Sequence, residues 1–215
     1  MHILVPVKNT SLAKSRLSGV LPPGQRRILT LHLLRVVLTA LTDSPEVNKV
    51  GALIYVVSDD TYVKEIACDF RVKFIDDNGC DDLNTALRIA AQSLVSLSAT
   101  TLWVFPSDLP RIKPEDVDAL LLQSDASPGV TIAPDACDQG TNALGISPPG
   151  LIDFSFGPGS FDRHCSAAHA KQAGLTILRR PGLSFDLDTP EDLSAYARDP
   201  ACYGRGQGLA YFMDH

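Results

Sequence analysis

The sequence has no apolar run that approaches the length of a membrane-spanning helix, no internal repeat and no low-complexity tract. It is also poor in positive charge, with 19 Lys and Arg against 25 Asp and Glu and a net charge of -6. These absences argue against a membrane span and against general binding to nucleic acid. The first expected strand begins at His2 and leaves no room for a signal peptide, so we expect a soluble, cytoplasmic protein.

Cysteine is present but is not arranged for cross-linking or for a structural zinc. The five cysteines, an odd number, include no C-x-x-C pair: Cys68, Cys80, Cys137, Cys165 and Cys202. Disulfide frameworks and structural zinc sites both need paired cysteines. The pattern therefore predicts reduced thiols, as expected in a cytoplasm.

The remaining composition is that of a globular enzyme-sized domain, with 215 residues of which 45% are hydrophobic and 20% charged. Strands are expected at 2–7, 50–57, 72–75, 101–105, 129–134, 142–147 and 175–178, and again around Asp186. Helices are expected at 23–41, 61–68, 82–97, from 114 onward, and at 162–172. Alternating strands and helices predict an α/β fold whose mostly parallel sheet is covered on both faces. We assign residues 1–198 to this domain and 199–215 to a C-terminal tail.

Two acidic residues near the C-terminus, Asp186 and Asp188, lie on the last expected strand. Alternate side chains of a strand share a face, so both carboxylates should point the same way. Thr189 can cap a following helix, with Pro190 at its first position and Asp192 three residues after the cap. Adjacent carboxylates repel unless a cation lies between them, and Mg²⁺ is the usual cation at such a site.

A third carboxylate, Asp108, follows another buried strand in the segment P-S-D-L-P. Each of these patterns also has a purely structural interpretation, because Asp before Thr-Pro often only caps a helix and Asp-Leu-Pro often only ends a strand. Two such corners in one α/β chain favour a metal site. We therefore predict that Asp108, Asp186 and Asp188 bind Mg²⁺.

The loop after the first strand carries three cations, Lys8, Lys14 and Arg16. Open α/β sheets bind ligands at this position. The loop contains neither G-x-G-x-x-G nor G-x-x-x-x-G-K-[ST], which argues against a dinucleotide fold or a P-loop. Two point charges and a guanidinium fork suit a triphosphate. A solvated basic loop is the alternative, and for Lys8 taken alone it is the better one.

Seven segments in order along the chain carry a further signal. They are V-P-V-K at the first strand, A-K-S-R-L in the loop, D-L-N-T-A-L at 82–87, S-D-L-P at 107–110, G-T-N-A-L at 140–144, F-G-x-x-S-x-x-x-H at 156–164 and D-x-D-T-P at 186–190. Together they resemble the 2-phospholactate guanylyltransferases of coenzyme F-420 biosynthesis, from Ile3 to about Ala195. The resemblance implies a GT-A-like, Rossmann-like three-layer α/β/α sandwich, related to molybdenum-cofactor guanylyltransferases and sugar nucleotidyltransferases.

The same resemblance implies an Mg²⁺-dependent transfer of GMP from GTP to the phosphate of a small three-carbon acid, with release of pyrophosphate. Family members use 2-phospholactate, phosphoenolpyruvate or 3-phosphoglycerate, and the sequence does not identify which. A phosphate is already largely dianionic at neutral pH, so such a nucleophile needs no general base. Repulsion between the two anions is the obstacle, and divalent ions and lysines reduce it.

Individual roles also follow from the resemblance. Catalysis is assigned to Asp108, Asp186, Asp188, Lys8 and Lys14; nucleotide binding to Lys8, Lys14, Arg16, Asp82 and Asn84; acid binding to Thr141, Gly157, Ser160 and His164. Asp82 and Asn84 are expected at the guanine edge, although helix capping is the alternative for Asp82. A structural role is the alternative for His164.

Other functions remain open at this point. They are a GT-A-like nucleotidyltransferase of the molybdenum-cofactor or sugar-phosphate type, a catalytically silent nucleotide-binding regulator and a retaining glycosyltransferase. A silent regulator is expected to lack one of the metal aspartates, and all three are present. A glycosyltransferase normally has its D-x-D in mid-chain, where only Asp108 stands. The expected partners are GTP and the phospho-acid, and both a homodimer and a contact with the next transferase of the pathway remain open.

Overall fold

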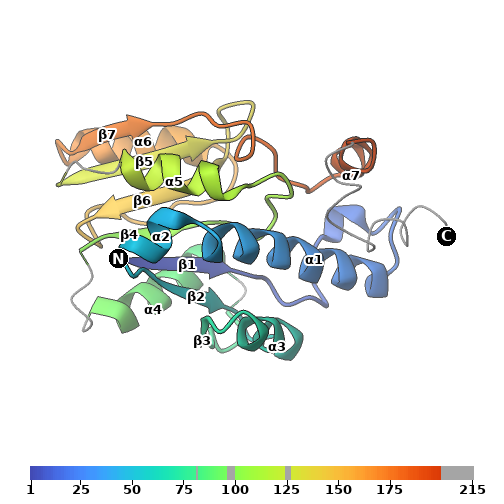
Figure 1. Cartoon of the computed structure of the whole chain (residues 1–215). Helices are drawn as coiled ribbons and strands as arrows, with labels where there is room; N and C mark the ends of the chain where they lie inside the picture. Colours follow the sequence, from blue (N-terminus) through green and yellow to red (C-terminus); the bar gives the residue numbers. More distant parts are fainter. Residues whose placement is uncertain (81, 96–99, 124–126, 200–215) are drawn as a thin grey trace.

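The computed structural model describes residues 1–80, 82–95, 100–123 and 127–199, and within them one seven-stranded sheet has the order β3-β2-β1-β4-β6-β5-β7 (Figure 1). The strands are β1 (His2–Pro6), β2 (Leu53–Val57), β3 (Lys73–Ile75), β4 (Leu102–Val104), β5 (Gly129–Pro134), β6 (Thr141–Ser147) and β7 (Gly174–Ile177). The helices are α1 (Pro23–Thr42), α2 (Pro45–Lys49), α3 (Thr61–Asp69), α4 (Leu83–Val95), α5 (Pro114–Leu122), α6 (Ser160–Ala170) and α7 (Pro190–Ala197), with the short 3-10 helix η1 (Ser15–Leu17).

The sheet is mostly parallel, as predicted. β1 pairs in parallel with β2 and β4, β2 with β3, and β5 with β7. β6 is antiparallel to both β4 and β5 and joins the two parallel parts. The loops after β1, β2, β3 and β4 therefore emerge at one edge of the sheet, where α/β proteins commonly bind ligands.

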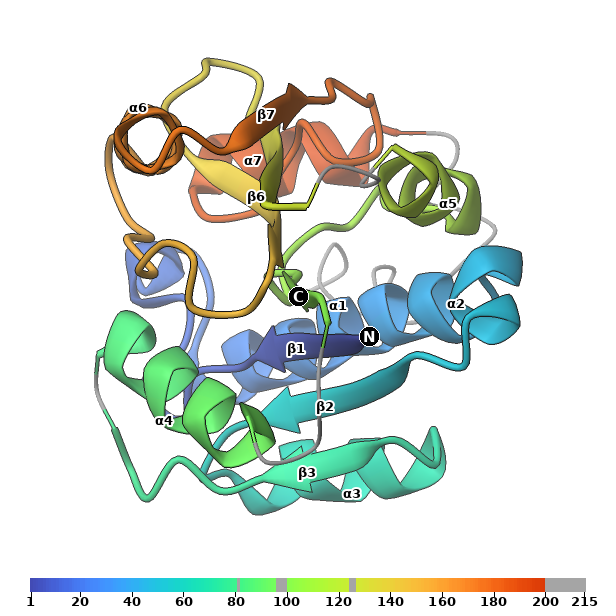
Figure 2. The same ribbon diagram turned by 90° about the vertical axis from the view of Figure 1, so that its left-hand side faces the viewer.

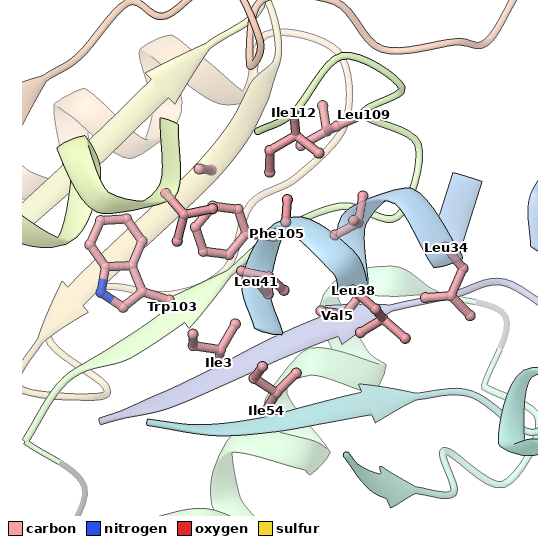
Figure 3. Packing of buried hydrophobic residues seen from close by; sticks show 14 of the residues in the cluster. Ile3, Val5, Leu34, Leu38, Leu41, Ile54, Trp103, Phe105, Leu109 and Ile112 are labelled. Carbon is pink, nitrogen blue, oxygen red and sulfur yellow. The ribbon is translucent and has the colours of Figure 1, made fainter. Parts of the chain in front are cut away.

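Helices cover both faces of this sheet and complete the predicted three layers (Figure 2). Alternate residues of each strand face opposite sides, so Ile3 and Val5 pack with α1, α3 and α5, whereas Leu4 packs with α4 and α6. On the first face, Trp103 and Phe105 belong to the same buried cluster as these β1 side chains and as Leu38 and Leu41 of α1 (Figure 3). Their complete burial makes the central strands a rigid base for the loops at the ligand-binding edge.

A smaller apolar cluster supports the loops at that edge. It unites η1, the first half of α1, α7 and the segment before α7, through Leu17, Leu21, Leu29, Leu33, Leu187 and Tyr196. α7 lies at the end of the sheet to which β1 points (Figure 1). The cluster fixes the basic loop after β1 against the chain that carries Asp186 and Asp188, far away in sequence.

Several sequence-based boundaries are corrected by the structure. The strand expected around Asp186 is absent: residues 185–188 belong to no strand of the sheet, and the Leu187 N–H donates to the Asp108 carbonyl at 3.0 Å. The strand expected from 50 begins at Leu53, because α2 and a turn with Gly51 at φ +61° precede it. The predicted Thr189–Asp192 capping box of α7 is present.

Some expectations fall outside the described residues. These are the alternative cap at Asp81, the end of the third expected helix at 97, Cys202 and the tail from residue 200 onward. The four cysteines that the structure describes are free thiols. None of the helices in the described ranges has the length and apolar character needed to cross a membrane.

Candidate active site

The loop between β1 and α1 is held in place by a carboxylate from the next loop along the sheet edge. The Thr10 N–H and hydroxyl both donate to Asp60 Oδ2, at 2.8 and 2.5 Å, while Asp60 Oδ1 caps α3 by accepting from the Tyr62 N–H. Burial alone would raise the pKa of Asp60, but these hydrogen bonds outweigh it and lower the pKa. The loop that carries Lys14 is thus tied to β2 and α3 before any ligand binds.

Lys14 lies at the centre of the site, where its ammonium is 2.9 Å from Asp108 Oδ2 and 2.9 Å from Asp188 Oδ1. The side chain is only 8% exposed, and the backbone of the residue is left-handed, with φ +53°. Burial would lower the pKa of Lys14, but the two carboxylates outweigh it and raise the pKa. In the same way Lys14 holds the pKa of Asp188 below its usual value in spite of burial.

Asp186 differs from its two acidic neighbours because none of the residues that the structure describes forms an ion pair with it. Burial, together with the negative charges of Asp108 and Asp188, raises the pKa of Asp186 to about 6. The side chain of Asn142, at the start of β6, donates to the Leu183 carbonyl at 2.8 Å, and its influence on Asp186 partly offsets this rise in pKa. The three predicted carboxylates thus influence one another electrostatically, although they come from two loops separated by most of the second half of the chain.

These residues fit a divalent cation but do not form a finished cage for one. Within the described residues, no three acidic, histidine or cysteine side chains converge on a common point as in a complete metal site. Lys14 occupies the space between Asp108 and Asp188. The uncompensated carboxyl of Asp186 nevertheless gains stability from a nearby cation. Mg²⁺ prefers such an open arrangement, because it binds one or two carboxylates and completes its shell with water and phosphate oxygens.

The other two predicted cations lie at the rim. Arg16 is 67% exposed, with Nη1 3.6 Å from Asp188 Oδ2, and Lys8 is exposed. Lys8 lines a cavity of about 60 Å³ at the ends of β1 and β2, next to α4, together with Asp77 and Leu83. Of these two cations, Arg16 thus borders the acidic centre, whereas Lys8 borders the cavity beside α4.

Asp77 was not singled out in the sequence. It is 9% exposed, and its pKa is raised by burial and by the charges of Asp59 and Asp76. The carboxylate also accepts from the Gly79 N–H at 3.2 Å. A run of four acids and a glycine within 76–82 looks like a solvated turn in sequence, and only the fold shows that Asp77 faces a cavity beside Lys8.

Asp82 and Asn84 lie at the start of α4, beside that cavity. Asp82 Oδ2 accepts from the Thr85 N–H at 2.8 Å and from its hydroxyl at 2.6 Å, so this carboxylate caps the helix. The Asn84 amide forms a pair of hydrogen bonds with Phe156, as Nδ2 donates to its carbonyl at 3.2 Å and Oδ1 accepts from its N–H at 2.7 Å. Asn84 thus joins the nucleotide side to a loop from the other half of the chain.

The residues predicted to bind the acid come together around α6. Thr141 Oγ1 is 3.0 Å from His164 Nδ1 and 3.2 Å from the Ser160 hydroxyl. Thr141 is 4% exposed, Ser160 1% and His164 0%. His164 Nε2 accepts from the Ser155 N–H at 3.0 Å. Three of the four predicted residues therefore form one buried hydrogen-bonded group.

Gly157 lies in the exposed loop above this group, where two glycines permit a conformation that other residues rarely adopt. Gly157 has φ +112° and Gly159, which precedes α6, has φ +71°. The Arg163 guanidinium holds the loop, donating to the Ser155 hydroxyl and carbonyl, each at 2.7 Å, and to the Pro158 carbonyl at 2.5 Å. The sequence assigned no role to Arg163. Two of its three acceptors are main-chain carbonyls and the third is a serine hydroxyl, and no sequence pattern shows that an arginine will bind such groups.

Comparisons with known proteins give a consistent result. The family profile described as "Guanylyl transferase CofC like" matches residues 1–197. A phosphoenolpyruvate guanylyltransferase from Rubrobacter xylanophilus is 42% identical over 191 residues, 89% of this chain and 90% of the relative. A phosphoenolpyruvate guanylyltransferase from Sphaerobacter thermophilus is 40% identical over 194 residues, 90% of this chain and 91% of the relative.

Solved structures share the fold at much lower identity. A protein described as a nucleotide-diphospho-sugar transferase from Desulfovibrio desulfuricans superposes with a TM-score of 0.74 at 19% identity, covering 97% of this chain and 92% of the other. A CMP:2-keto-3-deoxy-manno-octonic acid synthetase, solved with CTP, superposes with a TM-score of 0.59 at 15% identity, covering 90% of this chain and 95% of the other. The three-layer nucleotidyltransferase fold predicted from the sequence is confirmed.

Proposed function

This chain belongs to the family of CofC-like guanylyl transferases, and on that basis we propose that it transfers GMP from GTP to the phosphate of phosphoenolpyruvate, releasing pyrophosphate. The choice of acid among the three that were open follows the relatives at 42% and 40% identity, both named for phosphoenolpyruvate. The product would serve coenzyme F-420 biosynthesis, as the resemblance of the seven sequence segments implies.

One observation carries the proposal: Lys14 is buried between Asp108 and Asp188 at the sheet edge, and the third carboxyl, Asp186, has no cationic partner among the described residues. In the proposed reaction an oxygen of the acceptor phosphate attacks the α-phosphorus of GTP, and the bond to the β,γ-pyrophosphate breaks. No proton has to be removed from the nucleophile. The chain's task is to hold two polyanions together, and a buried ammonium beside carboxylates that attract a divalent ion suits it.

Mg²⁺ is part of this proposal, with Asp108, Asp186 and Asp188 as the residues that would hold it. When bound, the ion would neutralise phosphate charge and act as a Lewis acid at the α-phosphate. Lys14 would contribute its positive charge from within the site, and Lys8 and Arg16 from the rim. The three side chains would together offset part of the negative charge of the triphosphate.

We assign guanine recognition to the cavity beside Lys8. Guanine presents a ring N–H and an amino group on one edge, and the Asp77 carboxylate offers two acceptor oxygens to them. Adenine presents a lone pair at the corresponding ring nitrogen, which would face the carboxylate unfavourably. Asp82 and Asn84, at the start of α4 beside the cavity, remain predicted nucleotide contacts.

The proposal is tested by supplying the purified protein with each nucleotide and each acid in turn. We expect pyrophosphate release with GTP and phosphoenolpyruvate in the presence of Mg²⁺, and far less with ATP or CTP. Because the guanylylated acids are labile, the product is captured by coupling to the next transferase of the pathway. Equal turnover of GTP and CTP, or no turnover with any of phosphoenolpyruvate, 2-phospholactate and 3-phosphoglycerate, would contradict the proposal.

A further inference from the structure

His164 lies directly beneath the predicted acid-binding side and has no exposed surface. Its ring meets the edge of Phe156 at a centroid distance of 5.1 Å. Any influence of His164 on a bound ligand must therefore pass through the groups to which its ring is hydrogen-bonded. Those groups are the Ser155 N–H on one side and the Thr141 hydroxyl on the other.

The hydrogen bonds determine which nitrogen carries the proton. A backbone N–H can only donate, so the Ser155 N–H at 3.0 Å from Nε2 requires a lone pair on Nε2. Burial, with a further contribution from the charge of Arg163, lowers the pKa of His164 to about 4, and the ring is neutral near pH 7. A neutral imidazole with a lone pair on Nε2 carries its proton on Nδ1. Nδ1–H therefore donates to Thr141 Oγ1 at 3.0 Å.

This tautomer decides what the hydroxyl pair can do. Thr141 and Ser160 own two hydroxyl protons, and the bond of 3.2 Å between their oxygens uses one of them. Because His164 donates, the other proton is free to form a hydrogen bond outside the group. If Nδ1 accepted instead, Thr141 would donate to the histidine and Ser160 to Thr141, which would consume both protons. The Ser155 N–H thus indirectly makes the pair a net donor.

A net donor suits the charge of the predicted acceptor. Carboxylate and phosphate oxygens accept hydrogen bonds and cannot donate when ionised. Thr141 also directly precedes Asn142, whose side chain lowers the pKa of Asp186, so the pair is next in the chain to a residue that influences the acidic centre. Both residues are almost fully buried, so a hydrogen bond donated by the pair meets little competition from bulk water.

We propose that His164 is a positioning residue that orients the Thr141–Ser160 hydroxyl pair to donate a hydrogen bond to an anionic oxygen of the acceptor acid. The inference rests on the proposed function for the identity of that acid. It replaces direct substrate contact by His164 with action through Thr141. The site should accordingly favour acids with an ionised group at this point over analogues in which an amide places an N–H there.

Two variants of His164 separate the two hydrogen bonds. The side-chain amide of asparagine can place an N–H near the position of Nδ1, whereas glutamine can place an oxygen near that of Nε2. We expect His164→Gln to raise the KM for phosphoenolpyruvate about tenfold, the loss of one oriented hydrogen bond, and to leave the KM for GTP within about twofold. For His164→Asn, the KM values for both substrates should stay within about threefold of those of the wild type, because asparagine retains a donor to Thr141.

A purely structural role predicts a different result. Both variants leave part of the ring's volume empty, so both should lower the melting temperature to a similar extent. If they also raise the KM for the acid equally, His164 acts only through packing and the inference is wrong. Thr141→Val keeps the ring in place and removes the hydroxyl, and combined with His164→Gln it should cause no further loss. Additive losses in this double-mutant cycle would equally overturn the inference.

Ser160→Ala distinguishes failure of the inference from failure of the proposed function. If Ser160→Ala changes the KM for none of the three candidate acids, the acid does not bind here and the proposed site is wrong. If Ser160→Ala raises the KM for the acid while the two His164 variants change that KM equally, the acid site stands and only the positioning role of His164 is wrong. Calorimetric GTP binding close to that of the wild type is expected for all of these variants, since none lies at the nucleotide cavity.

Discussion

Removing the Lys14 ammonium should destabilise the protein by an amount that depends on pH in a characteristic way. Lys14→Met keeps most of the apolar stem and deletes the charge that contacts Asp108 and Asp188, each at 2.9 Å. Hydrogen bonds between charged groups contribute about 1.5–3 kcal/mol each, and breaking a buried ion pair costs about 3–5 kcal/mol. Because the two carboxylates are 25% and 38% exposed, solvent screening reduces this to about 2–4 kcal/mol at pH 7.

The sign of the pH dependence follows from the pKa directions. In the wild type, the lowered pKa of Asp188 stabilises the fold at pH values above 3.8, the usual pKa of this side chain. The contribution is lost as the pH falls through the lower pKa that Asp188 has in the folded protein. The pKa of Asp186 is raised to about 6, so its protonation instead stabilises the fold as the pH falls from about 6 toward 3.8. Without Lys14, Asp188 joins Asp186 in being easier to protonate when folded. The difference in unfolding free energy between the wild type and Lys14→Met should therefore become smaller as the pH falls from 7 to 4.

Urea unfolding across this pH range, with Mg²⁺ removed, measures the deficit directly. At neutral pH a loss of about 2–4 kcal/mol corresponds to roughly 5–15 °C in melting temperature for a domain of this size. Lys8→Met is the matched control, because Lys8 is exposed at the rim, and its stability should stay within about 0.5 kcal/mol of the wild type. An unchanged midpoint for Lys14→Met at pH 7, or a deficit that grows toward pH 4, would refute the reasoning.

Three further predictions address metal, nucleotide and fold. Asp188→Asn, nearly isosteric, should remove most turnover with the fold intact, and pyrophosphate release that matches the wild type at limiting Mg²⁺ would show that Asp188 is no metal ligand. Asp77→Asn should raise the KM for GTP by about tenfold or more and narrow the preference over ATP, so steady-state kinetics showing equal losses with both nucleotides would exclude guanine recognition. Gly145→Ala would place Cβ 2.7 Å from the Trp103 indole and should cost about 1–3 kcal/mol in urea unfolding, whereas an unchanged midpoint would mean that the indole moves freely.

The layered architecture could be predicted because its signals are local. Buried strands such as His2–Pro6 are continuous apolar runs, and helices such as α7 begin with a capping residue and a proline. The helix α2 was missed because its five residues are too short for a periodic pattern. The strand predicted around Asp186 was wrong, because alternating side chains show only that a segment is extended. Whether a neighbour supplies hydrogen bonds is decided by the fold, and here Asp108 supplies one.

The charged residues of the site could be identified from the sequence, but their partners could not. Lys14 and Asp188 are 174 positions apart, and no local pattern shows that the ammonium lies between two carboxylates. Asn84 was predicted at the guanine, yet its amide is paired with Phe156, 72 residues away. Asp77 was missed because burial of one acid in an acidic turn depends on the surrounding loops. Long-range contacts, rather than residue types, are what the sequence leaves undetermined.

The antiparallel β6 has a consequence for how this fold diversifies. The predicted nucleotide contacts all come from residues 8–84, whereas the predicted acid contacts all come from residues 141–164, after the chain has reversed direction at β6. A change of acid can therefore arise by exchange of the second segment, without alteration of the first. The join lies between β4 and β5, and the Asn84–Phe156 pair is a contact that such a recombinant would have to preserve. By these predicted contacts, the two substrate preferences are encoded in separate stretches of a chain that forms one continuous sheet.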